Sequence, residues 1–335
     1  MSLSLFRAAL AAATLALGAC AHKPLTFAAY GDMPYQAHVA DGRTDEQVLL
    51  QDIAPRLRAD PAIPFIIHVG DIGRPEMACN DAYLEHTRAH WARDLAKPVL
   101  YTPGDNEWMD CDRDKVPHAG SELARLDAVR RIFFSTPVAA PPEWQYRQQA
   151  GQPENASWQK DGVHFVTLHV VSKGNGREQV LKDDPAAAAQ LAAQRDANNR
   201  TWLEQAFARA RDSHGGALVI AMQFDLFGAP DGGPGAFERC ARHAVYGPVC
   251  RQIRDGAVAF GRPVLLVHGD TNAYCLDQPF GSTAAPLLWR LNAPGDYAPI
   301  DAAIVRVEPD AAQPFQVTGL LSAAPPPAVC DYTHH

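Results

Sequence analysis

The sequence of 335 residues lacks the local motifs of several common enzyme classes. It has no Gly-x-Ser-x-Gly nucleophile elbow, no glycine-rich P-loop and no dinucleotide-binding fingerprint, which disfavours a nucleophilic hydrolase and a nucleotide-binding enzyme of those types. The formal net charge of −8 is spread without long runs of like charge, so we predict no nucleic-acid partner.

The N-terminal hydrophobic run is too short to span a bilayer. One positive charge, Arg7, precedes an uncharged run from Ala8 to Ala19, a pattern typical of an export signal over residues 1–19. Leu17-Gly18-Ala19-Cys20 resembles a bacterial lipobox, in which cleavage leaves a lipid-modified Cys20. A plain cleaved signal with an incidental cysteine is the alternative. We expect an exported, periplasmic protein anchored to a membrane through lipidated Cys20, and Ala21 favours the outer membrane.

Cys-x-x-Cys spacing is also missing, which disfavours a thiolate metal site. Without Cys20 the chain keeps an even set of cysteines, and disulfides are the usual state in an exported protein. Many pairings are possible in principle. We predict three bridges from the places of the cysteines along the chain: Cys79 with Cys111, which both follow Gly-Asp loops, Cys240 with Cys250, which close a short loop, and Cys275 with Cys330.

Four apolar runs end in the dipeptide Gly-Asp. They are "LTFAAYGD" ending at Asp32, "PFIIHVGD" at Asp71, "PVLYTPGD" at Asp105 and "PVLLVHGD" at Asp270. A fifth pair, Gly295-Asp296, has no predicted strand before it. Gly-Asp is ordinary turn chemistry when it occurs once. Its repetition after similar runs predicts a shared site instead, because the ends of neighbouring parallel strands converge at one edge of a sheet.

Clustered carboxylates repel one another. Each must be protonated at a raised pKa or be neutralised by a bound cation, and a divalent metal is the simpler solution. The sequence therefore predicts a metal site at the strand ends.

Helical patterns alternate with the apolar runs. Residues 43–60 contain a capping box from Thr44 to Gln47, and residues 80–97 begin at the predicted N-cap Asn80. The resulting order of strand, helix, strand, helix, strand predicts an α/β fold with parallel strands. Further elements are then expected in the rest of the chain: helices from Ser121 and over about 186–212, and strands within 162–171, 216–227, 262–270, 302–309 and 315–322.

The order of these motifs resembles that of the calcineurin-like metallophosphoesterases. The likeness is carried by Asp32, Gly70-Asp71, "GDNE" at 104–107, a late strand ending at Gln223 and "HGDTN" at 268–272. It covers nearly all of the mature chain, and the motifs GDNEW and HGDT suggest a divergent exported bacterial branch. The resemblance implies an α/β/β/α sandwich of two mixed sheets flanked by helices. After a short linker at 20–25, residues 26–335 would form one such domain.

Every histidine of the family pattern is missing here. Asp32 and Asp71 match, but Asp105 stands where the family has a metal-binding asparagine and Asn106 where it has a histidine. Four further histidine positions hold other residues: Pro34, Gln223, Asp270 and Asn272. The resemblance thus implies a metal-ligand set that is rich in oxygen: Asp32, Asp71, Asp105, Gln223, Asp270 and Asn272.

We expect Asp71 to be the bridging ligand of this set. Carboxylate and amide oxygens suit Mg²⁺, Mn²⁺ or Ca²⁺ better than zinc or iron, and the set could hold one or two ions.

Three residues are candidates for the catalytic chemistry. Asn106 cannot serve as a general acid, although its amide could hold a phosphoryl oxygen. Glu107 and His268 are the candidates for protonating the leaving oxygen. His68 is expected to be a packed strand residue, and Trp108 could stack on a substrate or pack in the interior.

The resemblance implies a metal-dependent phosphoesterase that hydrolyses a phosphate mono- or diester through metal-activated water. Its substrate could be a small molecule or a lipid head group. The alternative is a catalytically impaired protein of the same fold with a binding or structural role in the cell envelope. The missing histidines favour the alternative, whereas the retained aspartates favour the enzyme; oligomeric state and substrate identity stay open.

Overall fold

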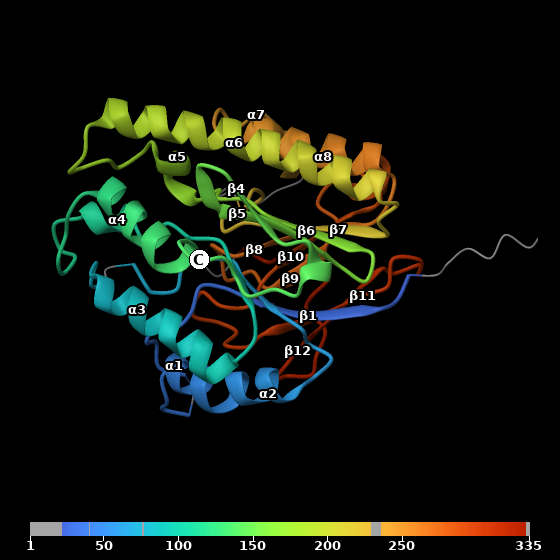
Figure 1. Cartoon of the computed structure of the whole chain (residues 1–335), viewed down its shortest axis with the longest axis horizontal. Helices are drawn as coiled ribbons and strands as arrows, with labels where there is room; N and C mark the ends of the chain where they lie inside the picture. The colour runs from blue at the N-terminus through green and yellow to red at the C-terminus, as the bar shows by residue number, and fades with distance from the viewer. Residues whose placement is uncertain (1–21, 40, 76, 229–235, 333–335) are drawn as a thin grey trace, which may run out of the picture.

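The computed structural model describes residues 22–39, 41–75, 77–228 and 236–332 (Figure 1). The expected signal at 1–19 and the lipobox cysteine Cys20 lie outside this part of the chain. Within it, no helix is both long and apolar enough to cross a membrane.

The first sheet has five strands in the order β12-β11-β1-β2-β3. Its strands are β1 Leu25–Tyr30, β2 Ile66–His68, β3 Val99–Tyr101, β11 Ala303–Val307 and β12 Phe315–Gly319. β1, β2 and β3 run parallel, whereas β11 pairs antiparallel with β1, and β12 with β11. The sheet is therefore mixed, and it joins the first and last strands of the described chain.

The second sheet has seven strands in the order β4-β5-β6-β7-β8-β10-β9. Its strands are β4 Arg147–Gln149, β5 Gln152–Lys160, β6 Val163–Thr167, β7 Ala217–Ala221, β8 Val264–His268, β9 Cys275–Asp277 and β10 Leu288–Asn292. The central strands β6, β7, β8 and β10 are parallel, whereas β5 pairs antiparallel with β6, β4 antiparallel with β5, and β9 antiparallel with β10.

Helices cover the outer faces of both sheets, so that the molecule has helix, sheet, sheet and helix layers (Figure 1). The α-helices are α1 Asp45–Val48, α2 Ala54–Ala59, α3 Asp81–His90, α4 Glu122–Val129, α5 Ser172–Gly176, α6 Pro185–Asp212, α7 Ala236–Arg242, α8 Gly247–Phe260 and α9 Gly281–Ala284. π-helical segments follow α1, α3 and α4, at Leu49–Ile53, Trp91–Leu95 and Arg130–Phe134, and short 3₁₀ turns lie at Met109–Asp112 and Pro142–Trp144.

Apolar side chains fill the space between the two sheets. Phe27 and Phe65 from the first sheet meet Trp158 and Phe165 from the second, and the rings of Phe65 and Phe165 lie 5.1 Å apart edge to face. Side chains on the opposite faces of the strands pack under the helices, because successive residues of a strand point to opposite sides. Both faces of the parallel strands are thus buried, as their continuous apolar runs predict.

The predicted sandwich of two mixed sheets flanked by helices is confirmed. The Thr44–Gln47 capping box is present, and Asn80 and Ser121 cap their helices as N-caps. The long helix expected over 186–212 is α6. The strand expected within 162–171 ends early, at Thr167.

Several elements were not predicted. Strands β4 and β5 were missed because their residues are mostly polar: the buried Gln152 and Asn155 of β5 are held by hydrogen bonds to Asn199 of α6. The short strands β9 and β10 and the helix α8 also escaped prediction.

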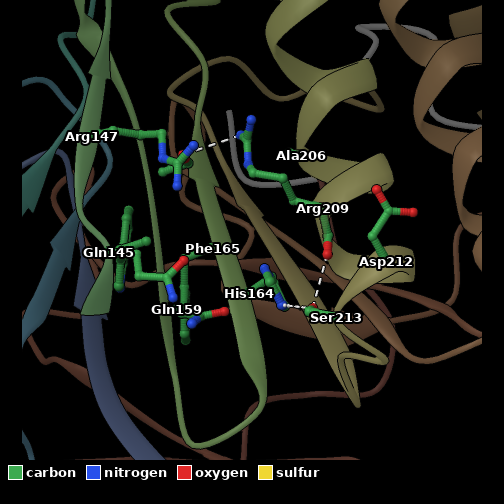
Figure 2. A pocket seen from close by; sticks show the side chains of 11 residues that line it. Gln145, Arg147, Gln159, His164, Phe165, Ala206, Arg209, Asp212 and Ser213 are labelled. Atoms are coloured by element: carbon green, nitrogen blue, oxygen red, sulfur yellow. Dashed lines mark hydrogen bonds between the residues drawn. The ribbon is translucent and has the colours of Figure 1, made fainter. Parts of the chain in front are cut away.

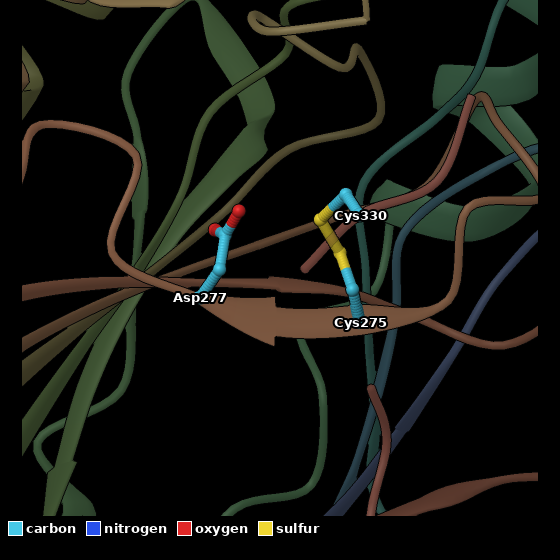
Figure 3. Close-up of side chains that lie close together, drawn as sticks. All are labelled: Cys275, Asp277 and Cys330. Atoms are coloured by element: carbon cyan, nitrogen blue, oxygen red, sulfur yellow. A yellow bond between two sulfur atoms is a disulfide. The ribbon is translucent and has the colours of Figure 1, made fainter. Parts of the chain in front are cut away.

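Three disulfides join the predicted pairs, Cys79–Cys111, Cys240–Cys250 and Cys275–Cys330. Cys240 and Cys250 lie in the adjacent helices α7 and α8, so their bridge joins two helices. The bridge between Cys275 and Cys330 fastens the C-terminal segment to β9 (Figure 3).

We predict that losing the Cys275–Cys330 bridge destabilises the chain more than losing the Cys240–Cys250 bridge. The two bridges close segments with sequence separations of 55 and 10 residues. A longer closed loop removes more entropy from the unfolded chain, about 4 kcal/mol against about 3 kcal/mol. Urea unfolding of the two Cys→Ala double variants, each with its other bridges intact, measures the difference. A larger loss for the short-loop pair would contradict this account.

Candidate metal centre

The ends of five strands from both sheets meet at one buried place. Asp32, Asp71 and Asp105 follow β1, β2 and β3 of the first sheet, and Gln223 and Asp270 follow β7 and β8 of the second. One carboxylate oxygen from each of Asp71, Asp105 and Asp270 lies within 4.8 Å of the other two. The predicted convergence of the Gly-Asp strand ends is therefore present in the structure.

Glycine precedes these aspartates because the strand ends approach one another closely. A Cβ atom on Gly104 would lie 1.9 Å from Oδ1 of Asp71, and one on Gly269 would lie 2.0 Å from Oδ2 of Asp32. Asp32, Asp71 and Asp270 themselves adopt left-handed backbone conformations with φ of 49°, 52° and 70°. Aspartate tolerates this region better than most residues, and such conformations concentrate at functional sites.

Gln223 occupies the centre of the cluster. Its Nε2 lies 3.0 Å from Oδ2 of Asp71, 3.1 Å from Oδ1 of Asp105 and 2.9 Å from Oδ1 of Asp270. An amide nitrogen carries two hydrogens and cannot fully satisfy three acceptors. Two other buried oxygens, Oε1 of Gln223 and Oδ2 of Asp32, have no hydrogen-bond partner within the described chain.

The fifth Gly-Asp pair also reaches this place, and the expectation that no strand precedes it is wrong. β10 ends at Asn292, shortly before Gly295-Asp296. The backbone N–H of Asp296 donates to the carbonyl oxygen of Asp32 at 2.9 Å. A Cβ atom on Gly295 would lie 2.0 Å from the carbonyl oxygen of Gly31, so glycine is required by close approach here too.

Burial and mutual repulsion favour the protonated form of several of these carboxyls. Burial is the largest cause that raises the pKa of Asp32, Asp71 and Asp270 well above the usual range. Neighbouring carboxylates raise these pKa values further, Asp296 acting on Asp32 and Asp105 acting on the other two. The cluster therefore favours either bound protons or a bound cation.

Lys173 supplies a positive charge to the cluster that the sequence patterns did not reveal. It lies in the left-handed turn α5, where Lys173 itself has φ of 50°, and its Nζ contacts Oδ2 of Asp105 and Oδ1 of Asp110. Burial lowers the pKa of Lys173, but the two carboxylates outweigh it and the net pKa is raised. No motif identifies Lys173, and the adjacent Gly174 and Gly176 are the only local sign of an unusual turn.

Glu107, a predicted catalytic residue, joins two of the strand-end loops. Its Oε1 accepts hydrogen bonds from the N–H of Ile72 at 2.9 Å and from the hydroxyl of Tyr101 at 2.8 Å, and its Oε2 accepts one from the N–H of Gly104 at 3.0 Å. Burial raises the pKa of Glu107 to about 7. Both carboxyl oxygens are thus engaged in holding the Asp71 and Asp105 loops together.

Asn106 lies beside Asp71 at the edge of the cluster. Its backbone N–H donates to Oδ1 of Asp71 at 3.1 Å, and its Nδ2 donates to the carbonyl oxygen of Gly73 at 2.9 Å and to the hydroxyl of Tyr35 at 3.3 Å. The side chain is half-buried, so part of the amide is exposed to solvent at the rim of the cluster.

His268 faces Asp225 rather than the centre of the cluster. Its ring is fully buried, with Nδ1 3.0 Å from the carbonyl oxygen of Gly269 and Nε2 3.6 Å from Oδ1 of Asp225. Burial lowers the pKa of His268, although Asp225 opposes this. Asn272, the remaining predicted ligand, is half-buried in the same loop, and no side-chain hydrogen bond engages it within the described chain.

Two other residues singled out in the sequence are packed in the interior. His68 lies edge to face against Tyr30 at 4.8 Å, and burial lowers its pKa to about 3. Trp108 is fully buried, with the guanidinium of Arg195 5.1 Å above its ring. Trp108 is therefore a packing residue and does not offer its face to a substrate.

A second cluster of potential metal ligands, formed by Cys275, Asp277 and Cys330, is not a metal site (Figure 3). Its two sulfur atoms are bonded to each other, and a disulfide offers no thiolate. The carboxylate of Asp277 is already engaged by the guanidinium of Arg290 at 2.6 Å.

We predict that Asp270→Asn stabilises the chelator-treated protein at neutral pH. A carboxyl with a raised pKa binds its proton more tightly in the folded chain, so its burial costs stability as pH rises above about 4, the unfolded value. The variant should exceed wild type by about 1 kcal/mol at pH 7.5 and match it near pH 4 in urea unfolding. Asp114→Asn, at an exposed position, is the control; lower stability of Asp270→Asn at pH 7.5 would contradict the argument.

Comparison with known proteins identifies the fold. No protein-family model matches the sequence, and no curated protein matches it. Among solved structures, the chain is similar to the structure of PhoD with a TM-score of 0.51 at 11% sequence identity. The match covers 88% of this chain and 65% of that one, so the chain spans slightly less than two thirds of the PhoD structure. The two mixed sheets and their flanking helices thus form a sandwich similar to the fold of PhoD.

Proposed function

We propose that this protein is a metal-dependent phosphoesterase that hydrolyses a phosphate mono- or diester at the strand ends. The observation that carries the proposal is the buried convergence of Asp71, Asp105 and Asp270 around the amide of Gln223. The PhoD-like fold supports the same reaction class. Clustered carboxylates of this kind are unfavourable without a cation, which argues that the cluster is kept for a function.

The residues present fit a divalent metal. The unpartnered oxygens of Gln223 and Asp32 are buried, and each needs a positive partner or a donor. Rotation of the Gln223 amide by half a turn would exchange its nitrogen and oxygen and direct Oε1 toward the carboxylates. An all-oxygen set of Asp71, Asp105, Asp270 and Gln223 suits Mg²⁺, Mn²⁺ or Ca²⁺.

Asp32 and Asn272 are the remaining candidate ligands, for a second ion that shares Asp71. Gln223 and the three aspartates around it already form a set without them. We therefore propose that the place around Gln223 fills first.

A bound divalent ion would polarise a phosphoryl oxygen and lower the pKa of a water molecule. Among the protein's own side chains, Lys173 is the first candidate for binding the substrate. Its ammonium group lies at the rim of the cluster, in contact with the carboxylates of Asp105 and Asp110. With Asp105 holding a cation, the ammonium group of Lys173 would be available to bind a phosphoryl oxygen of the substrate. Asn106 lies at the same rim, where its amide nitrogen already donates to Gly73 and Tyr35.

This site is poorly equipped to protonate the leaving oxygen of the substrate. Asn106 has no proton to release, His268 is buried against Asp225, and both oxygens of Glu107 are held by the two loops. Lys173, with its raised pKa, is a weak acid. We therefore propose substrates whose leaving groups need little protonation, and poorly activated alkyl esters should react slowly.

The same contacts also favour a second candidate function. Lys173 already neutralises Asp105, and Gln223 donates to three carboxylates. Groups of the protein itself therefore pair with the carboxylates of the cluster without any metal. A protein that retains the fold for binding or structure in the cell envelope would show this arrangement and no turnover. Metal dependence distinguishes the two functions.

The proposed place of action is the periplasm, with attachment to the outer membrane through a lipidated Cys20. Three disulfides support an oxidising compartment. A phosphate ester, either a small molecule or a lipid head group, would then be the partner.

We predict that Asp71→Asn weakens Mn²⁺ binding at least about 100-fold, because losing a direct ligand costs no less than losing its outer-shell support. Calorimetric titration of the chelator-stripped mature chain, together with hydrolysis of an activated aryl phosphodiester and monoester, measures binding and turnover. Asp114→Asn makes the same chemical change at an exposed residue and serves as the control. Wild-type Mn²⁺ affinity in Asp71→Asn would exclude the proposed centre, and binding without turnover in the wild-type protein would favour the second function.

We predict that Lys173→Met separates metal binding from turnover. Removing the ammonium group frees Asp105 for the metal, so Mn²⁺ affinity should rise about tenfold, which corresponds to about 1.4 kcal/mol. Turnover should fall about 100-fold because a transition-state donor is lost. Lys182→Met, which breaks the exposed pair with Asp114, is the matched control. Unchanged metal affinity and turnover in Lys173→Met would show that the lysine only packs against its neighbours.

A further inference from the structure

A second polar pocket lies at the opposite end of the seven-stranded sheet from the acidic cluster. It has a volume of about 420 Å³ and is formed by β4, β5, the start of β6 and the last turns of α6 (Figure 2). His164 lies at the start of β6, whereas Gln223 follows the end of β7, which runs parallel to it. The pocket is therefore separate from the candidate metal centre.

Two arginines bring positive charge to this pocket. Arg209 of α6 is fixed in place, since its guanidinium lies 5.1 Å from the centre of the Trp202 ring and its Nη2 donates to Oγ of Ser157 at 3.2 Å. Arg147 of β4 is the cross-strand partner of the same Ser157. In the described chain no carboxylate forms an ion pair with either arginine, which is unusual for two guanidinium groups that share a wall.

The charges of the two arginines act on each other. Burial lowers the pKa of Arg209, and the charge of Arg147 lowers it further. Arg147 is exposed, and its side chain makes no hydrogen bond to the described residues. A bound anion would relieve this repulsion and would provide the acceptor that Arg147 lacks.

Neutral polar side chains complete the pocket. Burial and the charge of Arg209 lower the pKa of His164 to about 4, so the ring is neutral at pH 7, and its Nε2 lies 2.7 Å from Oγ of Ser213. Gln145 and Gln159 line the remaining wall. Asp212, which also lines the pocket, lies on the other side of Arg209 from Arg147 (Figure 2).

We propose that this pocket binds the phosphate group of a small ligand between Arg147 and Arg209. Guanidinium groups match the oxygens of phosphate in geometry as well as in charge. The volume falls within the range of small-molecule sites and exceeds what a phosphate group alone needs, which leaves room for an attached organic part. The site does not depend on the acidic cluster or on any metal.

Calorimetric titration tests the proposal with two probes, inorganic phosphate and glycerol phosphate. The mature chain is stripped of metal, the chelator is removed, and chloride at equal ionic strength provides the reference. We expect saturable binding of at least one probe. Tighter binding of glycerol phosphate would identify an organic phosphate as the source of the group, and equal binding would identify free phosphate.

Arg147→Gln is the decisive variant, because this side chain makes no contact that the fold needs. It should weaken binding at least tenfold, and Arg209→Lys, which keeps the charge but loses the planar fork, should also weaken it. Arg211→Gln, an exposed arginine two residues further along α6, should bind as wild type does. Undiminished binding in Arg147→Gln, an equal loss in Arg211→Gln, or an effect that chloride reproduces would overturn the proposal. Asp71→Asn should leave this binding unchanged.

Discussion

Negative charge buried between the ends of two sheets is the constraint on which the rest of this structure depends. Carboxylates as close as those of Asp71, Asp105 and Asp270 are unfavourable in an interior of low polarity. The surrounding chain stabilises these carboxyls in three ways: Gln223 donates hydrogen bonds, Lys173 supplies an ammonium group, and the raised pKa of Asp71 favours a bound proton. The glycines before the aspartates belong to the same solution, since any side chain there would separate the strand ends.

Residues that the sequence pattern placed in the reaction instead support the site. Glu107 resembles a candidate acid because it lies two residues after Asp105, yet its oxygens tie together the loops that carry Asp71 and Asp105. His268 lies two residues before Asp270, but its ring lies against Asp225, because β8 ends at His268 and Asp270 itself adopts a left-handed backbone conformation outside the strand. Neighbourhood in sequence at a strand end therefore does not fix which side chain faces the cluster.

The local pattern predicted the parallel strands and the core of the candidate site, because both repeat it, whereas the sandwich of two sheets was implied by the family resemblance. Apolar runs that end in Gly-Asp mark parallel strands whose ends must converge. What escaped prediction depends on tertiary contacts: Lys173 reaches Asp105 across 68 positions of sequence. β5 looked like a polar connection because the hydrogen bonds that permit its burial come from α6. Asp296 was passed over because the strand before it is short and carries Arg290.

The position of β1 in the five-stranded sheet makes an early strand depend on a late one for its pairing. β1 lies between β2, which follows soon after it, and the antiparallel β11 at residues 303–307. During synthesis one edge of β1 therefore stays unpaired until nearly the whole chain has been made. An unpaired edge of this kind readily pairs with another chain. Antiparallel pairing with β11 covers this edge, so the five-stranded sheet is complete only after residues 303–307 have joined it.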